Sequence, residues 1–201
     1  MRRFGLEISR YIKRILRKLI SNFILFYLNI GKKIFGIEFV TKFLSQTSLV
    51  FLIPSILTKF GAKVGENVNI KNIIIDNALS DFRNLKIGSK VFIGRGVFFD
   101  LPDEIIIEDE AVIAANVQIF THEDVGDRIM RKYVRRKQEK VIIGRGTWIG
   151  AGCVILCGTV IEPMCIVAAG AVVKGRLESG WIYGGVPAKK IKRIWEEGKD
   201  S

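Results

Sequence analysis

The chain contains one histidine, His122, at the start of the charged stretch "THEDVGDRIMRKYVRRKQEK" that covers residues 121–140. Imidazole titrates near neutral pH, so it can take a proton from a hydroxyl group and later return it to a leaving group. Most single histidines are ordinary surface or structural residues, but this one stands where a regular pattern breaks into a polar loop. Insertions in repetitive folds often build the binding face. The position therefore predicts that His122 acts as a general base.

The other candidate nucleophiles are three cysteines, Cys153, Cys157 and Cys165. Their number is odd, their spacing is not that of metal ligands, and none adjoins a base as a catalytic nucleophile would. We therefore expect them to be small core residues of a protein in a reducing compartment.

The sequence on both sides of the loop repeats with a period of six residues. Aliphatic or aromatic residues recur at this interval in three blocks, and a small or β-branched residue usually stands four places after each. The in-phase residues are Val64, Ile70, Ile87, Ile93, Phe99, Ile107, Ile113, Ile119, Ile143, Ile149, Ile155, Ile161, Val167 and Val173.

A period of six fits neither a helix nor a simple strand, but it is the signature of a parallel β-helix. Each six residues form one short strand and one corner, three units complete a turn, and the stacked turns bury one core. A β-sandwich would instead show two-residue alternation with turns every 8–12 residues. We expect a β-helix domain over residues 59–182, with the loop 121–140 projecting from it.

Residues 1–58 form a different segment. The chain of 201 residues carries a net charge of +12, and residues 1–58 contribute a large share of its positive charge. Apolar and basic residues lie on opposite sides of a helical wheel, as in an amphipathic helix. We expect Gly31 and Gly36 to break this helix. The apolar side is Ile8, Ile12, Ile15, Leu19 and Phe23, and the basic side is Arg10, Lys13, Arg14, Arg17 and Lys18.

Two roles for this segment are compatible. Its helices could cover the open end of the β-helix and prevent further strand pairing, or its basic face could meet anionic lipid at the inner membrane face. Its uncharged runs, 19–31 and 43–58, are shorter than the ~20 residues that span a bilayer, and the early charges do not fit a cleavable signal peptide. We expect a cytoplasmic protein that does not bind nucleic acid, and the second of these two roles would place it peripherally at the inner membrane face.

Several motifs together resemble a known family. The hexads, the loop opening with Thr121-His122, "WIG" at 148–150, "AAG" at 168–170 and "GGVPAKKIKRI" at 184–194 are similar to the left-handed β-helix O-acetyltransferases that modify sugars and bacterial polysaccharides. The resemblance covers residues 60–194. It implies a homotrimer with active sites between neighbouring β-helices, acetyl-CoA as acyl donor, and no metal.

The resemblance also assigns residues. His122 matches the loop histidine that acts as general base on a sugar or glycan hydroxyl. Trp148 matches the tryptophan beside the cofactor arm, Ala151 and Ala169 match positions whose backbone meets pantetheine, and Lys189 and Lys192 match basic residues near the cofactor phosphates. Residues 183–201 are expected to form a tail with a short C-terminal helix.

The sequence does not identify the acceptor molecule. Galactoside- and maltose-type relatives carry an acceptor-binding asparagine that "IGRGVFFD" at 93–100 lacks, and we interpret Asn116 as a corner residue, since asparagine tolerates left-handed conformations. The cations of the loop could attract an anionic or lipid-linked glycan. These cations are Arg128, Arg131, Lys132, Arg135, Arg136 and Lys137.

Three other functions are alternatives to O-acetyl transfer. A γ-type carbonic anhydrase needs three histidines per zinc, which one His122 per chain does not supply. An N-acetyltransferase acting on an amino sugar or nucleotide sugar would use the same base and cofactor cleft. A non-enzymatic β-helix scaffold would have no need of His122 and Trp148.

Overall fold

The computed structural model describes residues 2–195, with side chains from residue 11 onward. Ile8 and Arg10, which the sequence placed on the amphipathic helix, and the tail 196–201 lie outside the described side chains. The chain divides into two units, Met1–Val40 and Thr41–Ser201.

The first unit is dominated by one long helix, α1 (Arg2–Phe35), followed by the start of α2 (Glu38–Gln46). Gly36 ends α1 as predicted, with a φ of 77° and its amide donating to the Lys32 carbonyl at 2.9 Å. The predicted break at Gly31 is wrong. A Cβ there would overlap the ring of Phe39, which packs on Tyr27 and Phe35. Gly31 therefore allows the Phe39 ring to lie directly against the backbone of α1. No helix in the described part of the chain is long and apolar enough to cross a membrane.

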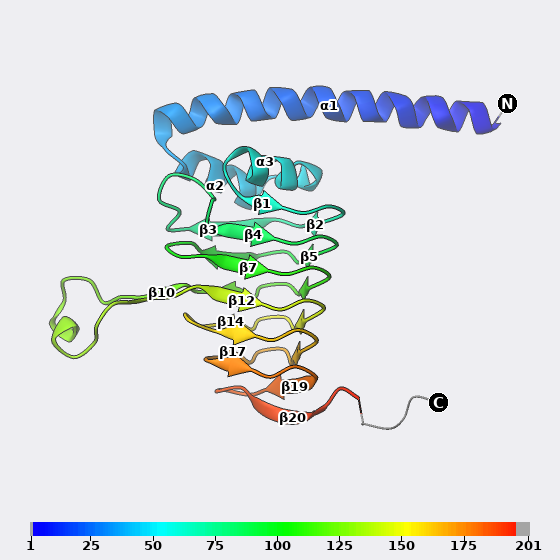
Figure 1. Cartoon of the computed structure of the whole chain (residues 1–201). Coiled ribbons are helices and arrows are strands. Elements are labelled where there is room, and N and C mark those ends of the chain that lie inside the picture. The colour runs from blue at the N-terminus through cyan, green and yellow to red at the C-terminus, as the bar shows by residue number, and fades with distance from the viewer. Residues whose placement is uncertain (1, 196–201) are drawn as a thin grey trace. The chain divides into compact units, whose positions relative to one another are not determined.

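The second unit is a parallel β-helix whose strands form three sheets (Figure 1). Sheet A contains β1 (Lys63–Val64), β4 (Leu85–Ile87), β7 (Ile105–Ile107), β12 (Val141–Ile143), β15 (Val160–Ile161) and β18 (Arg176–Leu177). Sheet B contains β2 (Asn69–Ile70), β5 (Phe92–Ile93), β8 (Val112–Ile113), β13 (Trp148–Ile149), β16 (Ile166–Val167), β19 (Trp181–Gly184) and β20 (Lys189–Arg193). Sheet C contains β3 (Ile73–Asp76), β6 (Val97–Asp100), β9 (Gln118–Ile119), β14 (Val154–Ile155) and β17 (Val172–Val173).

The predicted hexads are the core of this coil. In sheet A, Ile107 pairs with Ile143 and Ile143 with Ile161, and the other two sheets repeat this in-register stacking. Of the fourteen in-phase residues named above, all except Val64 are buried. The small residues four places on also face inward, and Thr147, Cys153 and Ala171 are fully buried. A period of six therefore does generate three flat, inward-facing strands per turn.

The corners between strands need a left-handed residue. Asn116 has a φ of 59°, which confirms its interpretation as a corner residue. Gly150 is required for space and not for its backbone conformation, because a Cβ there would lie 2.5 Å from the amide nitrogen of Ala169 in the next turn. Adjacent turns thus approach so closely that some corner positions exclude any side chain.

Both ends of the coil are covered. At the first turn, α3 (Ile53–Lys59) lies beside β1 and η1 (Val50–Leu52) beside β2, and the Phe60 carbonyl accepts a hydrogen bond from the Phe82 amide at 2.8 Å. Ile53, Ile56 and Leu57 of α3 are fully buried. This part of the N-terminal segment covers the edge of the sheet, as the first of the two expected roles required.

At the last turn the predicted C-terminal helix is wrong for the described residues. Lys189–Arg193 form strand β20, which pairs antiparallel with β19. Lys190 and Arg193 lie over the ring of Trp181, at 4.6 and 4.5 Å from its centroid. A helix would leave the edge of β19 unpaired and these cation–π contacts unmade.

The three cysteines are buried and free, which confirms them as core residues. Burial raises the pKa of the Cys165 thiol to about 11, and burial also raises the pKa values of Cys153 and Cys157. We expect none of them to react with Ellman's reagent at pH 8 in the native protein, and all three to react in denaturant. Rapid labelling of the folded chain would contradict this packing.

Candidate active site

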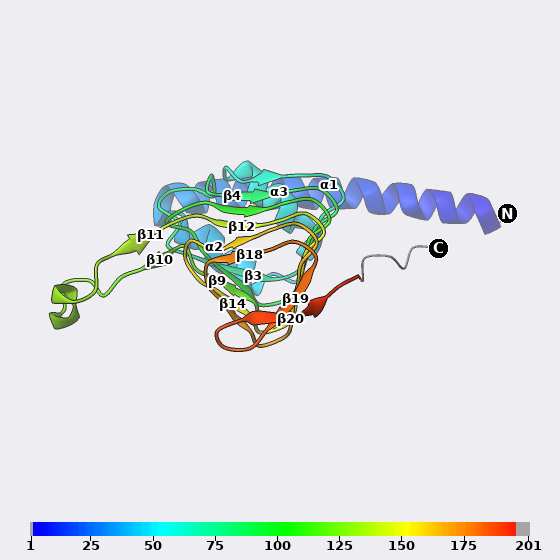
Figure 2. The same cartoon turned by 60° about the horizontal axis from the view of Figure 1, so that its bottom comes forward.

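The loop leaves the coil at one corner. It follows β9 of sheet C and precedes β12 of sheet A, and it consists of a hairpin of β10 (His122–Glu123) and β11 (Lys137–Gln138) with a short helix η2 (Ile129–Lys132) at its tip. Figure 2 shows the hairpin projecting away from the stacked turns. Val141 of β12 pairs with Ile105 of β7, so the coil resumes in register after the excursion.

The base of the hairpin is fixed to the coil. The Thr121 hydroxyl donates to the Asp100 carbonyl at 2.8 Å and accepts from the Asp103 amide at 3.1 Å. The Thr121 carbonyl accepts from the Glu139 amide at 3.0 Å, and the Gln138 side chain donates to the Pro102 carbonyl at 3.1 Å. His122 therefore begins from a rigid position, although its hairpin extends into solvent.

The His122 ring is held by a buried carboxylate. Its Nδ1 lies 2.7 Å from Oδ2 of Asp100 at the end of β6, where the Asp100 side chain is 1% exposed and that of His122 is 25% exposed. A carboxylate acceptor places the ring proton on Nδ1 and leaves a lone pair on Nε2. The exposed fraction leaves this ring accessible to another molecule. The arrangement is that of an oriented general base.

Asp100 is itself fixed by further donors. Its Oδ2 also accepts from the amides of Thr121, at 3.0 Å, and His122, at 3.2 Å, while Oδ1 accepts from Nδ2 of Asn77 at 2.7 Å. Both carboxylate oxygens are thus held in place by hydrogen bonds, and the His122 ring cannot turn without losing its contact with Asp100. Sequence reasoning missed Asp100 and Asn77. The signal available was the register, because pairing of Phe99 with Ile119 places Asp100 beside the loop base.

The predicted cofactor residues lie along another part of the coil. Trp148 is on the outer face of sheet B, between Val112 and Ile166 of neighbouring strands, and is 53% exposed. Ala151 and Ala169 are exposed at successive turns of the corner that leads from sheet B to sheet C, and the Ala151 carbonyl accepts from the Gly170 amide at 2.9 Å. Gly152 and Gly170 follow them. An extended ligand could therefore approach the backbone at this corner without meeting a large side chain.

Lys189 and Lys192 extend from β20, one turn further along the coil. Their neighbours Lys190 and Arg193 are occupied with Trp181, and Lys190 is also paired with Glu178 at 2.7 Å. Among the described side chains, Lys189 and Lys192 have no acidic group within ion-pair distance. They are the two cations of this strand that an anionic ligand would find without a competing acid.

One chain does not bring these residues together. His122 leaves the corner between sheets C and A, whereas Ala151 and Ala169 occupy the corner between sheets B and C. Sheet C lies between these two corners. A site that uses both His122 and the alanine corner must therefore either span sheet C within one chain or include the corner of a second copy.

The positive charge of the loop is partly neutralised. Arg131 is paired with Asp127, Lys137 with Glu139 at 3.2 Å, and Arg136 lies 3.9 Å from Asp124. Hydrogen bonding from the Gly126 amide, with a smaller contribution from Arg136, lowers the pKa of the Asp124 carboxyl, which favours its charged form. A cavity of about 450 Å³ between these arms is lined by Asp124 and Asp127 as well as by arginines. The loop is thus less cationic than its composition indicates.

Comparison with known proteins identifies the repeat. Residues 140–175 match the family model described as bacterial transferase hexapeptide (six repeats). The chain has the left-handed β-helix of the hexapeptide-repeat acetyltransferases. It is 26% identical to a maltose O-acetyltransferase from Clostridium difficile, with a TM-score of 0.64 over 78% of this chain and 83% of that one. The predicted left-handed β-helix and the resemblance are therefore confirmed.

Two more relatives of this hexapeptide-repeat chain extend the comparison. An N-acyltransferase from Bacillus cereus, solved with dTDP and coenzyme A, is 28% identical with a TM-score of 0.57, over 66% of this chain and 73% of that one. An Escherichia coli protein named for O-acetyl transfer in lipopolysaccharide biosynthesis is 39% identical over 59 residues, or 29% of this chain and 30% of its own length. The chain spans between 30% and 59% of the length of the first curated relatives that it matches.

Proposed function

We propose that the protein transfers an acetyl group from acetyl-CoA to a hydroxyl of a sugar or glycan precursor, with His122 as general base. The observation that carries this proposal is the 2.7 Å contact between Nδ1 of His122 and the buried carboxylate of Asp100. The carboxylate is itself fixed at both oxygens, so it holds the ring in the orientation that a general base needs. The buried free thiols fit the reducing cytoplasm in which acetyl-CoA is supplied.

Each group in the site has a task in this reaction. The Nε2 lone pair of His122 takes the acceptor proton as the acceptor oxygen bonds to the thioester carbonyl carbon. Asp100 stabilises the resulting imidazolium and keeps its orientation. When the carbon–sulfur bond breaks, Nε2 returns the proton to the departing thiolate. No covalent bond to the protein is required, in agreement with three cysteines that are all buried.

The corner and the end of the coil would hold the acyl donor. Acetyl-CoA supplies an activated acetyl thioester on a long pantetheine arm that ends in phosphates. Trp148 offers an exposed ring and Ala151 and Ala169 an unobstructed backbone. Lys189 and Lys192 offer positive charge that no acid among the described residues pairs with. Lysine binds phosphate as a point charge, so these residues fit such a ligand.

The two lysines give a prediction about the donor. Changing Lys189 and Lys192 together to alanine should raise the KM for acetyl-CoA about tenfold and leave kcat within about twofold, because their contacts would be equal in the ground and transition states. Lys190→Ala is the matched control, since Lys190 is engaged with Glu178 and Trp181. Steady-state kinetics with varied acetyl-CoA measures both constants. An equal rise in KM for the control would contradict the assignment.

The separation of His122 from the alanine corner supports a homotrimer with sites between subunits. Ile129 and Tyr133 at the loop tip are 77% and 80% exposed, and such apolar side chains fit a surface that a neighbouring subunit covers. His122 of one subunit would then face the corner of the next.

Mixing two inactive variants tests this shared site. His122→Ala lacks the base, and Ala169→Trp fills the corner. If each site takes its base from one subunit and its corner from the next, randomly reassembled equimolar trimers should recover about a quarter of the wild-type rate. Recovery of activity in hybrids, measured after co-refolding or subunit exchange and confirmed by native mass spectrometry, is the expected result. Verified hybrids without activity would place the site within one chain.

Acceptor chemistry is tested directly. The same base and donor site could acylate an amine, and the similarity to a Bacillus cereus N-acyltransferase favours this as the second candidate. Purified protein would be incubated with acetyl-CoA and matched pairs of sugars that differ only in a hydroxyl or an amino group. We expect acceptor-dependent thiol release with an ester product that alkaline hydroxylamine cleaves. A hydroxylamine-stable amide would favour N-acyl transfer, and no thiol release with any sugar would favour a scaffold.

A further inference from the structure

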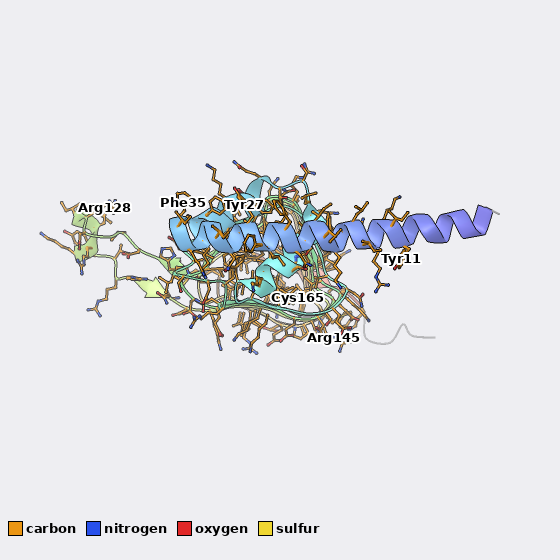
Figure 3. All side chains as sticks on the ribbon, turned by 90° about the horizontal axis from the view of Figure 1, so that it is seen from above. Tyr11, Tyr27, Phe35, Arg128, Arg145 and Cys165 are labelled. Carbon is orange, nitrogen blue, oxygen red and sulfur yellow. The ribbon has the colours of Figure 1, made fainter. Side chains whose placement is uncertain are left out.

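Helix α1 carries an exposed apolar stripe along most of its length. Ten large apolar side chains, separated by one, three or four residues, are each at least 40% exposed, and Figure 3 shows side chains projecting along the helix from Tyr11 to Phe35. Leu28, on the opposite side, is fully buried. The stripe is formed by Ile12, Ile15, Leu16, Leu19, Ile20, Phe23, Phe26, Tyr27, Ile30 and Ile34.

The stripe is continuous and long. From Ile12 to Ile34 it extends over roughly 33 Å, at 1.5 Å per residue. Contiguous exposed apolar surface of this kind marks an interaction site, because single exposed apolar residues are common on soluble proteins but long rows are not. In its C-terminal half Phe23, Phe26, Ile30 and Ile34 border a hollow of about 300 Å³ that is lined by apolar side chains.

The charge beside the stripe has one sign. Between residues 11 and 37 there are six basic residues and no acidic residue. Lys13, Arg14, Arg17 and Lys18 occupy the side of the helix away from the stripe or its margins, and Lys32 and Lys33 lie in the last turn. The helix is therefore amphipathic, with an apolar stripe on one side and positive charge around much of the rest.

We propose that α1 binds the surface of a membrane that contains anionic phospholipid. The helix lies along the interface with the stripe among the acyl chains, and its cations meet the headgroup phosphates. Phe23 and Phe26 are the deepest anchors, because they are the most exposed residues of the stripe together with Ile34. The hollow beside them has the size and polarity to take part of an acyl chain. This inference does not depend on acyl transfer.

A second copy of the chain is the competing occupant, because part of the stripe has the three-and-four spacing of a helix–helix seam. The charges oppose it. From residue 11 to residue 37 the chain has six basic residues and no acidic residue, so a second α1 offers no acid over this length to attract these cations. Anionic lipid is complementary to the same cations, so the observations favour the membrane.

The test is sedimentation of the full chain with vesicles of phosphatidylcholine alone or with 30% phosphatidylglycerol. We expect binding to the anionic vesicles, a weakening of about fivefold for each of Lys13, Arg14 and Lys18 that is changed to glutamine, and a further loss at high salt. Phe23→Glu should weaken binding at least tenfold, because its side chain no longer enters the apolar layer. Leu79→Glu is the matched control, since it adds the same charge at an exposed leucine of the other unit and should change binding less than twofold.

Three outcomes would overturn the proposal. One is the absence of binding to anionic vesicles at low salt, and another is an equal loss of binding in Phe23→Glu and Leu79→Glu. The third is self-association in light scattering that Phe23→Glu abolishes while vesicles are not bound, which would assign the stripe to a second copy. Circular dichroism confirms that each variant remains folded, as expected for changes at exposed positions.

Discussion

Replacing His122 by alanine is expected to lower kcat/KM for acetyl transfer by about 10²- to 10⁴-fold, the range that a positioned general base contributes. The loss should appear in kcat, because the base acts in the transition state and not in binding. Stability should change little. The ring is 25% exposed, and the Asp100 carboxylate still accepts from two amides and from Asn77.

Glu123→Gln is the control for this prediction, because Glu123 is the next residue of the same short strand. It should retain near wild-type kcat and the same melting temperature. Thiol release from acetyl-CoA with the best acceptor measures both variants. A His122→Ala protein with wild-type kcat would remove the basis of the proposed mechanism, even if the fold and the donor site were correct.

Replacing Asp100 by asparagine is expected to lower kcat by about 10²- to 10⁴-fold while His122 remains in place. The asparagine amide can donate to Nδ1, which moves the ring proton to Nε2 and removes the lone pair that the reaction needs. A buried amide also cannot accept all of the donors that meet this carboxylate, so we expect a loss of about 1–3 kcal/mol in the free energy of unfolding.

Asp76→Asn controls for the chemical change, because Asp76 is the partner of Asp100 in the neighbouring strand but is exposed. Its kcat should be unchanged. Since the chain contains only one histidine, ¹⁵N NMR of the untagged protein reports the tautomer of His122 alone. The Nδ1–H form in wild type and the Nε2–H form in Asp100→Asn are expected. The same tautomer in both proteins would show that Asp100 acts only on stability.

The coil could be predicted from sequence because its rule is local and repeated. Apart from Val64, each in-phase aliphatic residue, such as Ile149, both ends a strand and fills the core, so the residue type and its position in the repeat point to the same fold. The loop could be predicted for the same reason, as an interruption of that count. His122 was identified by its place in the loop and by its uniqueness.

The residues that sequence reasoning missed depend on partners far along the chain. In the sequence Asp100 is one polar residue at the end of a strand, and only pairing across 22 residues shows that it meets His122. The strand Lys189–Arg193 was predicted as a helix because its basic residues suit a helix surface equally well. Pairing with the edge of β19 and packing on the ring of Trp181 favour the strand over the helix. The sequence of residues 189–193 by itself shows neither contact.

The point where the hairpin leaves the coil has an evolutionary consequence. Val154 pairs with Gln118 and Val141 with Ile105, so the turns before and after the excursion stack as if it were absent. Residues between Glu123 and Lys137 can therefore be lengthened, shortened or exchanged with little cost to the scaffold. Selection can vary what the protein recognises while the machinery at the root of the hairpin stays constant.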